Sequence, residues 1–309
     1  MQKIRIATRE SQLALWQAEH VQALLRQKFP ELSVSLVPMT TRGDQIQDKP
    51  LAEIGGKGLF LKELEQALLA DEADIAVHSV KDVPAVLPTA MQMPAFLARA
   101  NPADAFVSNN YANLESLPPG AIVGTSSLRR RSHLLARRSD LDVRDLRGNV
   151  NTRIAKLDAG EYAAIILACA GLERLGWGQR ITEVLSVSHW LPSPGQGTIG
   201  IECCDGSPAA AYIQALDDPT ARCTSLAERA LAARLGAGCH WPLSAFAVVT
   251  DMQLQMHAGL AMPDGSHSVA VEGSANCADA QALGSRLADQ LLDTGGRQIV
   301  AALDNASDN

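Results

Sequence analysis

Short apolar runs alternate with polar turns and amphipathic helices along the first two thirds of the chain. Residues 4–7, Ile-Arg-Ile-Ala, predict a strand, and residues 8–11 form a polar turn. From there to Leu25, apolar residues recur at helical spacing, so a helix is predicted to begin at Ser11. Free N–H groups at a helix start attract anions, which makes Arg9 and Ser11 candidate binding residues. A capped helix beside a solvated arginine gives the same pattern.

The next clear strand signal ends in charged residues. An apolar run over residues 75–77 leads into His-Ser-Val-Lys-Asp-Val, and Pro84 follows. This predicts a buried strand that stops abruptly and leaves Ser79, Lys81 and Asp82 near its carboxyl end. Ligands of open α/β sheets bind at the carboxyl ends of strands. A surface loop that carries a lysine and an aspartate by chance is the alternative.

Similar units return between residues 122 and 168. Strands are predicted at 122–124, 143–146 and 164–168. A Thr-Ser-Ser turn follows the first of them, and Asn149 is placed to cap a helix after the second. Two α/β units that face each other form a cleft.

Two crossings, which are segments where the chain passes from one unit to the other, connect these units. Prolines before residue 95 and the segment 101–104 predict a connection between domains, and a Pro- and Gly-rich segment that contains Gln196 predicts a second one. An apolar run at 199–203 then returns to the first unit. The expected domains are residues 1–98 with 198–216, and residues 102–193.

The composition changes at about residue 219. A helix is predicted at 222–235, a glycine-rich turn follows it, and three strands and two helices complete the chain. Residues 219–309 are therefore expected to form a small α+β third domain. Cys239 lies in the glycine-rich turn beside His240, which can lower the pKa of a thiol. An inert cysteine in a turn is the alternative.

The overall composition is that of a soluble globular protein. Of the 309 residues, 47% are hydrophobic and 20% are charged. No apolar run approaches the ~20 residues that span a bilayer, and the first residues lack the apolar core of a signal peptide. We expect a cytoplasmic protein that does not bind membranes.

The six cysteines show no zinc-binding spacing and no CxxC pair. A disulfide framework is unexpected in a chain of this length without a secretion signal, so buried or incidental thiols are predicted. No metal site is predicted.

Basic residues are concentrated in one segment of an otherwise acidic chain. The net charge of −7 argues against nucleic-acid binding, yet residues 126–156 hold nine of the 27 basic residues. Arginine forks suit carboxylates and phosphates. Arg129, Arg130, Arg147 and Arg153 fall at or near predicted strand ends and are expected to bind a ligand, whereas Arg137 and Arg138 are expected to be solvated.

A glycine-rich stretch precedes the strand at 75–77. Three glycines surround Lys57, which predicts a mobile loop able to approach a ligand closely. The spacing is not that of a Walker A loop.

Taken together, these segments resemble the porphobilinogen deaminases, also called hydroxymethylbilane synthases. Eight motifs in chain order carry the resemblance: Ile6-Ala7-Thr8-Arg9, Thr41-Arg42-Gly43-Asp44, Gly55-Gly56-Lys57-Gly58-Leu59-Phe60, His78-Ser79-Val80-Lys81-Asp82-Val83-Pro84, Gly124-Thr125-Ser126-Ser127-Leu128-Arg129-Arg130, Leu146-Arg147-Gly148-Asn149, Gly195-Gln196-Gly197 and Gly238-Cys239.

The resemblance implies an α/β protein with two periplasmic-binding-protein-like α/β domains around a cleft, plus a small α+β C-terminal domain. It implies a transferase of haem biosynthesis that joins four porphobilinogen molecules head to tail, releases one ammonia for each, and hydrolyses off hydroxymethylbilane. The implied cofactor is a dipyrromethane, built from the same substrate and held by a thioether at Cys239. The implied partner is the small-molecule substrate alone, and a monomer is expected.

The match also implies roles for individual residues. Asp82 corresponds to the catalytic aspartate, which would stabilise positive charge near the pyrrole N–H groups and move protons. Lys81 would pair with a cofactor carboxylate, and Lys57 would lie on a flexible lid. The expected cofactor- and substrate-binding residues are Arg9, Ser11, Lys57, Ser79, Lys81, Thr125, Ser126, Ser127, Arg129, Arg130, Arg147, Asn149, Arg153 and Gln196.

Some positions depart from the family pattern, and other functions stay open on the residues alone. Asn151, the pair His240-Trp241 and Glu53 replace residue types more common in the family, which puts loop geometry and rate in question. The alternatives are an anion-binding protein without catalysis, a hydrolase or transferase with Cys239 as nucleophile, and a lyase that forms a Schiff base on Lys81.

Overall fold

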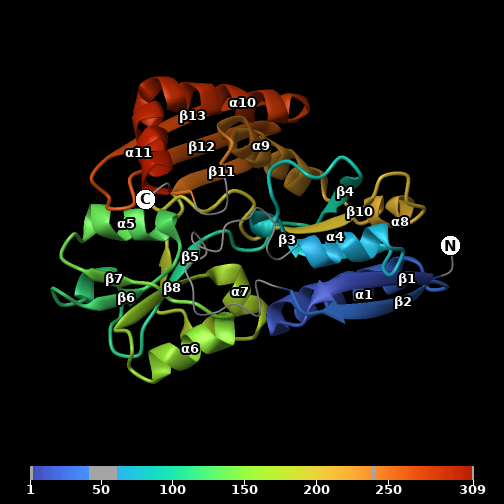
Figure 1. The fold of residues 1–309 in the computed structure, drawn as a ribbon, viewed down its shortest axis with the longest axis horizontal. Coiled ribbons are helices and arrows are strands. Elements are labelled where there is room, and N and C mark those ends of the chain that lie inside the picture. The colour runs from blue at the N-terminus through green and yellow to red at the C-terminus, as the bar shows by residue number, and fades with distance from the viewer. Residues whose placement is uncertain (1–2, 42–60, 238–240, 308–309) are drawn as a thin grey trace.

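The chain folds around three β-sheets, each with its own helices. The structure is a computed structural model, and it describes residues 3–41, 61–237 and 241–307. Two five-stranded sheets lie side by side in the lower part of Figure 1, and a three-stranded sheet with its helices lies above them. The α/β class predicted from the sequence is confirmed.

The first sheet has the strand order β2-β1-β3-β10-β4. Strand β1 pairs in parallel with β2 and β3, whereas β10 is antiparallel to both of its neighbours, β3 and β4. The strands are β1 (Lys3–Arg9), β2 (Ser33–Met39), β3 (Ile75–Ser79), β4 (Met91–Phe96) and β10 (Ile199–Cys204), and the helices are α1 (Gln12–Lys28), α4 (Lys62–Leu69) and α8 (Ala210–Gln214).

The second sheet repeats this plan with the order β7-β6-β8-β5-β9. Strand β6 is parallel to β7 and β8, and β5 is antiparallel to β8 and β9. The strands are β5 (Asp104–Val107), β6 (Ile122–Gly124), β7 (Asp142–Arg144), β8 (Ala164–Ala168) and β9 (Glu183–Leu185), and the helices are α5 (Leu128–Arg137), α6 (Val150–Asp158) and α7 (Cys169–Arg174).

The antiparallel fourth strand of each sheet comes directly after a crossing between the two units. Strand β5 enters the second sheet from residues 97–103, and β10 returns to the first sheet from residues 191–198. The two crossings touch: the Ala100 N–H donates to the Gly197 carbonyl at 3.1 Å. A side chain at Gly197 would place its Cβ 2.6 Å from the Ala100 carbonyl oxygen, so glycine is required for this approach.

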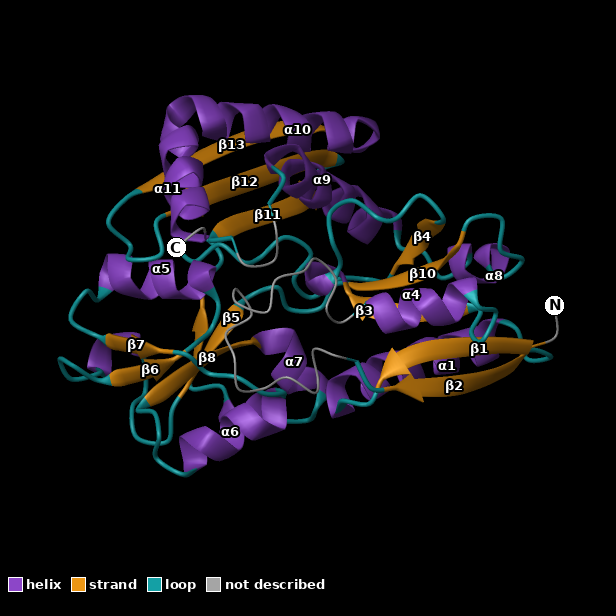
Figure 2. Ribbon diagram, viewed as in Figure 1, coloured by secondary structure: helices purple, strands orange, loops and turns teal. Residues whose placement is uncertain are grey.

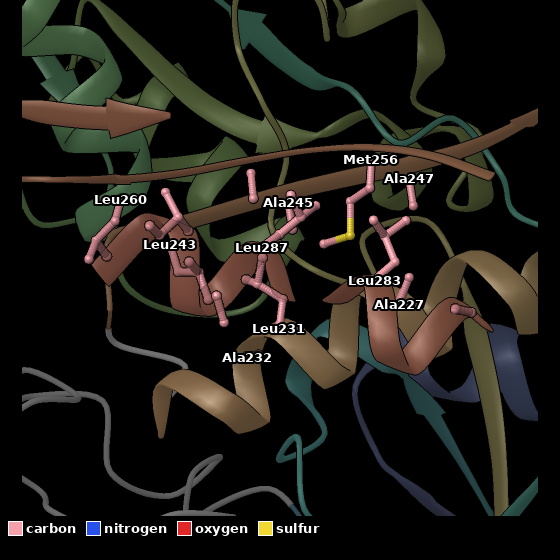
Figure 3. Close-up of a cluster of buried hydrophobic side chains, with 14 of the residues drawn as sticks. Ala227, Leu231, Ala232, Leu243, Ala245, Ala247, Met256, Leu260, Leu283 and Leu287 are labelled. Carbon is pink, nitrogen blue, oxygen red and sulfur yellow. The ribbon is translucent and has the colours of Figure 1, made fainter. Parts of the chain in front are cut away.

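The C-terminal unit packs helices on one face of an antiparallel sheet. Its strands are in the order β11-β12-β13, and Figure 3 shows alanine, leucine and methionine side chains of the sheet meeting those of α9 and α10. Figure 2 shows α9 between this sheet and β4 of the first unit. The elements are α9 (Pro219–Leu235), β11 (Leu243–Thr250), β12 (Gln253–Ala261), β13 (Ser268–Asn276), α10 (Ala280–Leu291) and α11 (Arg297–Ser307).

Two strands lie where the sequence predicted only a connection. Strand β4 contains Pro94, and it is an edge strand, where a missing N–H donor is tolerated. Strand β5 follows Asn101-Pro102 and is only four residues long, so its apolar signal is weak. The short strand β9 and helix α7 were also not predicted.

The prediction for the cysteines needs correction. Cys223 and Cys277 form a disulfide that ties α9 to the segment before α10, although free thiols were predicted. The sequence could not show that two cysteines 54 positions apart meet in the folded unit. No helix in the described part of the chain has the length and apolar character needed to cross a membrane.

Candidate active site

The segment after β3 forms the floor of the candidate site. The strand ends at Ser79, and residues Val80–Asp82 make one tight turn in which the Val83 N–H donates to the Val80 carbonyl. Val80 is buried, and its N–H donates to Thr198 in the second crossing at 3.0 Å. The turn is therefore anchored to the core and to the crossing, while Asp82 is exposed.

A small cavity of about 60 Å³ brings the predicted residues of the first unit together. Arg9, Ser11, Ser79 and Asp82 all line it. Ser11 caps α1 by accepting from the Ala14 N–H at 3.4 Å, and Ser79 accepts from the Gln17 side chain at 2.8 Å. These contacts place the start of α1 beside the carboxyl end of β3.

Lys81 points from the first unit toward the second. Its ammonium donates to the Gln196 side-chain oxygen at 3.3 Å, and the Gln196 amide donates to Asp104 at 2.9 Å and to the Pro102 carbonyl at 2.7 Å. Burial lowers the pKa of Lys81 to about 8, and the nearby guanidiniums of Arg130 and Arg129 act in the same direction. Asp82 and Asp104 oppose the shift.

Asp104 is the centre of the arginine cluster. One of its oxygens accepts from Arg130 at 2.7 and 3.1 Å, and the other accepts from Arg129 at 2.7 Å and from the Trp190 indole at 2.8 Å. Burial favours the neutral acid, but Arg129 and Arg130 together hold the pKa of Asp104 well below its usual range. This buried, fully bonded carboxylate fixes the planes of both guanidiniums.

The cluster still carries unused hydrogen-bonding capacity. The remaining bonds of Arg129 and Arg130 run to the Leu191 and Ile166 carbonyls at 2.9 Å. The buried Nε of Arg129 makes no hydrogen bond to any residue that the structure describes. Burial also lowers the pKa of Arg129, with Asp104 opposing the shift.

Arg153 joins the cluster from α6. Its Nε donates to the Gly148 carbonyl at 2.8 Å, and burial lowers its pKa to about 10, assisted by Arg130 and Arg147. Asp82 opposes this shift, which places the arginines of the second unit within electrostatic range of the aspartate of the first. The geometry therefore brings Lys81, Asp82 and the predicted arginines into one region.

The predicted hydroxyl and amide groups act on the backbone of the second unit. Ser127 caps α5 and Asn149 caps α6, by accepting from the N–H groups of Arg130 and Thr152 respectively. Thr125 accepts from the Ser127 N–H at 3.2 Å, and Ser126 both donates to and accepts from Leu146. These residues shape the helix starts at the site.

Several residues singled out from the sequence are not part of this described arrangement. Lys57 and Cys239 fall outside the described residues, as do Glu53 and His240. Arg138 is not solvated as expected: it is half-buried, pairs with Asp140 and donates to the Leu117 carbonyl at 2.9 Å. Its place at the C-terminus of α5 lets it bind loop carbonyls that no local pattern reveals.

Sequence reasoning missed the two carboxylates that hold the crossings. Asp104 is one, and Glu228 of α9 is the other. Glu228 accepts from the Arg99 guanidinium at 2.6 Å, from the Gly195 N–H at 2.6 Å and from the Ala247 N–H at 2.8 Å. A single acidic residue within a mostly apolar segment was the available signal, because burial of such a residue requires partners.

Comparisons with known proteins agree on one family. The family model described as "Porphobilinogen deaminase, dipyromethane cofactor binding domain" matches residues 4–211, and "Porphobilinogen deaminase, C-terminal domain" matches residues 222–293. The chain belongs to the porphobilinogen deaminase family. A porphobilinogen deaminase of Chromobacterium violaceum is 52% identical over 304 residues, which cover 98% of each chain. One of Stenotrophomonas maltophilia is 52% identical over 97% of this chain and 99% of its own.

Solved structures of binding proteins are more distant from this porphobilinogen deaminase family member. The methionine-binding protein MetQ is 13% identical, with a TM-score of 0.45 over 70% of this chain and 89% of its own. At that similarity the likeness carries no further argument.

The donor set fits the cofactor of the porphobilinogen deaminase family. A dipyrromethane made from porphobilinogen carries several carboxylates. The site offers a half-buried lysine and a group of arginines, of which Arg129 has an unused buried donor. Lys81 and Arg153 interact electrostatically with Arg129, Arg130 and Arg147 and with the carboxylates of Asp82 and Asp104, so the cations outnumber the carboxylates within this group of seven residues. Bound carboxylates would compensate this excess.

Proposed function

We propose that this chain joins four porphobilinogen molecules head to tail into hydroxymethylbilane, with release of one ammonia for each, and that the candidate site carries out this reaction. The observation that carries the proposal is the hydrogen-bonded connection from Lys81, which follows β3 beside Asp82, through Gln196 to Asp104 and the two arginines bound to it. The enzyme class follows from the family; the assignment of individual residues is the proposed part.

The arginines and Lys81 would bind and orient carboxylates. Porphobilinogen carries an acetate and a propionate, so each added unit brings two carboxylates that need paired donors. Arg129 and Arg130 are preorganised by Asp104, which lowers the entropy lost when a ligand binds. Lys81, Arg147, Arg153 and Arg9 would complete the anion site, and Lys57 would add a further cation. The neutral contacts would come from Ser11, Ser79, Thr125, Ser126, Ser127, Asn149 and Gln196.

Asp82 would act on the reacting centre. It is exposed at the floor of the site while the lysine beside it is half-buried. Its carboxylate would stabilise positive charge on a pyrrole ring, hold the pyrrole N–H, and accept and return a proton. A dipyrromethane bound at this site supplies the free pyrrole carbon to which the first substrate unit is joined.

Other parts of the account are proposals of the same kind. We propose attachment of the dipyrromethane at Cys239, a cytoplasmic monomer, and domains at residues 1–98 with 198–216, 102–193 and 219–309. The disposition of the three sheets supports these boundaries.

Intact-mass measurement tests the attachment. The purified wild-type chain is expected to carry a mass equal to two porphobilinogen units less two ammonia molecules, and Cys239→Ser is expected to lack it. Cys204→Ser is the matched control, because Cys204 is a free, partly exposed thiol. An active wild-type protein with the unmodified mass would contradict the proposal.

A further inference from the structure

A cavity larger than the one around Arg9 and Asp82 lies away from the candidate active site. Its volume is about 720 Å³, and it is bounded by the segment after Asp82, by β4, and by one face of α9 and α10. None of its lining residues also lines the small cavity around Arg9 and Asp82. The larger cavity therefore needs an explanation of its own.

The lining combines an apolar surface with three arginines. Leu87, Met93 and Phe96 come from the first unit. Arg222, Arg229 and Arg234 come from α9, and no aspartate or glutamate in the described part of the chain lines the cavity. This is a cationic surface on a chain whose net charge is −7, so its charge is local and does not follow from the overall composition.

Arg222 and Arg234 are paired with carboxylates that lie outside the cavity. Arg222 pairs with Asp217 at 2.5 Å, and its guanidinium also lies over the Phe96 ring. Arg234 pairs with Asp289 at 2.8 Å, where both side chains are about half exposed. Neither carboxylate belongs to the lining.

Arg229 differs from these two arginines. Its η nitrogens donate to the carbonyls of Val83, Pro84 and Ala85 at 2.8 to 3.4 Å, and it forms no ion pair with any residue that the structure describes. Burial lowers its pKa, with Glu202 opposing the shift. A partly buried guanidinium without a carboxylate partner, fixed in position by three carbonyls, is preorganised to receive one.

We propose that this cavity is a second binding site, which takes a carboxylate attached to an apolar body. The carboxylate would pair with Arg229, and the apolar body would lie against Leu87, Met93 and Phe96. A ligand without the negative charge would leave the guanidinium uncompensated, and a small inorganic anion would leave the apolar surface exposed to water. The site is distinct from the one at which substrate carboxylates are expected.

Calorimetric titration of the holoenzyme tests this site with a matched pair of probes. 1-Naphthaleneacetate carries a carboxylate and an apolar body, and 2-(1-naphthyl)ethanol has a similar body without charge. We expect one saturable site for the acid, with binding at least about tenfold tighter than for the alcohol, because a hydrogen bond to a charged group is stronger than a neutral one. Equal affinity for the two probes, or no saturable binding, would overturn the proposal.

Two variants locate the probe. Arg229→Gln removes the cation, and Ala233→Glu places a carboxylate on a partly exposed lining position one helical turn from Arg229, where it can compensate the cation in place of a ligand. Each is expected to weaken binding of the acid at least tenfold. Arg286→Gln is the control, because Arg286 is an exposed arginine of α10 outside the lining.

Active-site binding of the probe is the competing outcome. Arg9→Gln should leave its affinity unchanged if the large cavity is the site. Loss of binding in Arg9→Gln, with retention in Ala233→Glu, would place the probe in the candidate active site and overturn the proposal. If Arg229→Gln fails to fold, Ala233→Glu decides the question alone.

Discussion

The two five-stranded units have the same strand order, yet they treat a buried carboxylate in opposite ways. The antiparallel strand of each unit carries one acidic residue that is fully buried: Asp104 on β5 and Glu202 on β10. Both oxygens of Asp104 are hydrogen-bonded, to two arginines, an indole and an amide. Among the described residues, one oxygen of Glu202 is hydrogen-bonded to His78 at 2.8 Å, and the other oxygen has no hydrogen-bond partner.

This difference shows how one topology serves two purposes. In the second unit, the carboxylate fixes two arginines of the proposed carboxylate-binding site. In the first unit, the proposed reactive residues lie in the turn after β3. The buried acid, Glu202 of β10, contacts His78 of β3. We therefore expect the second unit to depend on Asp104 for both its fold and the proposed site, and the first unit to depend on Glu202 for its fold alone.

Asp104→Asn should have the larger effect on stability. The asparagine side chain lacks the negative charge that compensates Arg129 and Arg130. Its NH₂ group is a hydrogen-bond donor, so it cannot accept the hydrogen bonds that the guanidiniums donate. We expect a loss of about 3–5 kcal/mol in the free energy of unfolding, the cost of breaking a buried pair. Urea denaturation measures it, and porphobilinogen turnover should fall as well. A change below about 1 kcal/mol would show that Asp104 does not hold the arginines.

Glu202→Gln should be milder and should spare the site. One oxygen already lacks a partner among the described residues, and an amide can still bond to His78. We expect a loss of about 1 kcal/mol, the net value of a typical hydrogen bond. Substrate KM should stay within twofold of the wild type. A loss equal to that of Asp104→Asn would remove the distinction between the two units.

The smallest expected effect concerns the protonation state of Lys81, which can be changed by pH without a substitution. Its pKa of about 8 lies below the unfolded value of 10.5, so the unfolded chain binds more protons between these pH values. Its contribution to stability should therefore rise as pH increases from 8 to 10.5, and the cation available to a carboxylate should be lost above about pH 8. The extent of reductive methylation of Lys81 in Cys239→Ser can be measured as a function of pH by peptide mass analysis. The midpoint of this pH dependence should lie near pH 8. A midpoint near pH 10.5 would contradict the claim that burial lowers the pKa of Lys81.

Much of the fold could be predicted from the sequence because its signals are local. The strand at 164–168, the caps at Ser11 and Asn149 and the return of β10 to the first sheet all depend on short patterns. Strand β4 could not be predicted, because Pro94 is acceptable only at a sheet edge, which the sequence does not mark.

The sequence allowed residues of the candidate site to be proposed, but it did not reveal the contacts that hold them. Asp104 lies 25 and 26 positions from the two arginines that it binds. Glu228 lies 129 positions from Arg99. Pairings over such distances depend on the tertiary fold, and no spacing along the chain indicates them.

Turnover by Asp82→Ala tests the central claim most directly. Porphobilinogen consumption and ammonia release should be measured together, with intact mass to show that the variant still carries its dipyrromethane. The proposed role predicts a loss of about 10²–10⁴-fold, the usual contribution of a general acid–base group. The fold should be kept, because Asp82 is exposed and outside the core. Turnover close to that of the wild type in the cofactor-bearing variant would contradict the account.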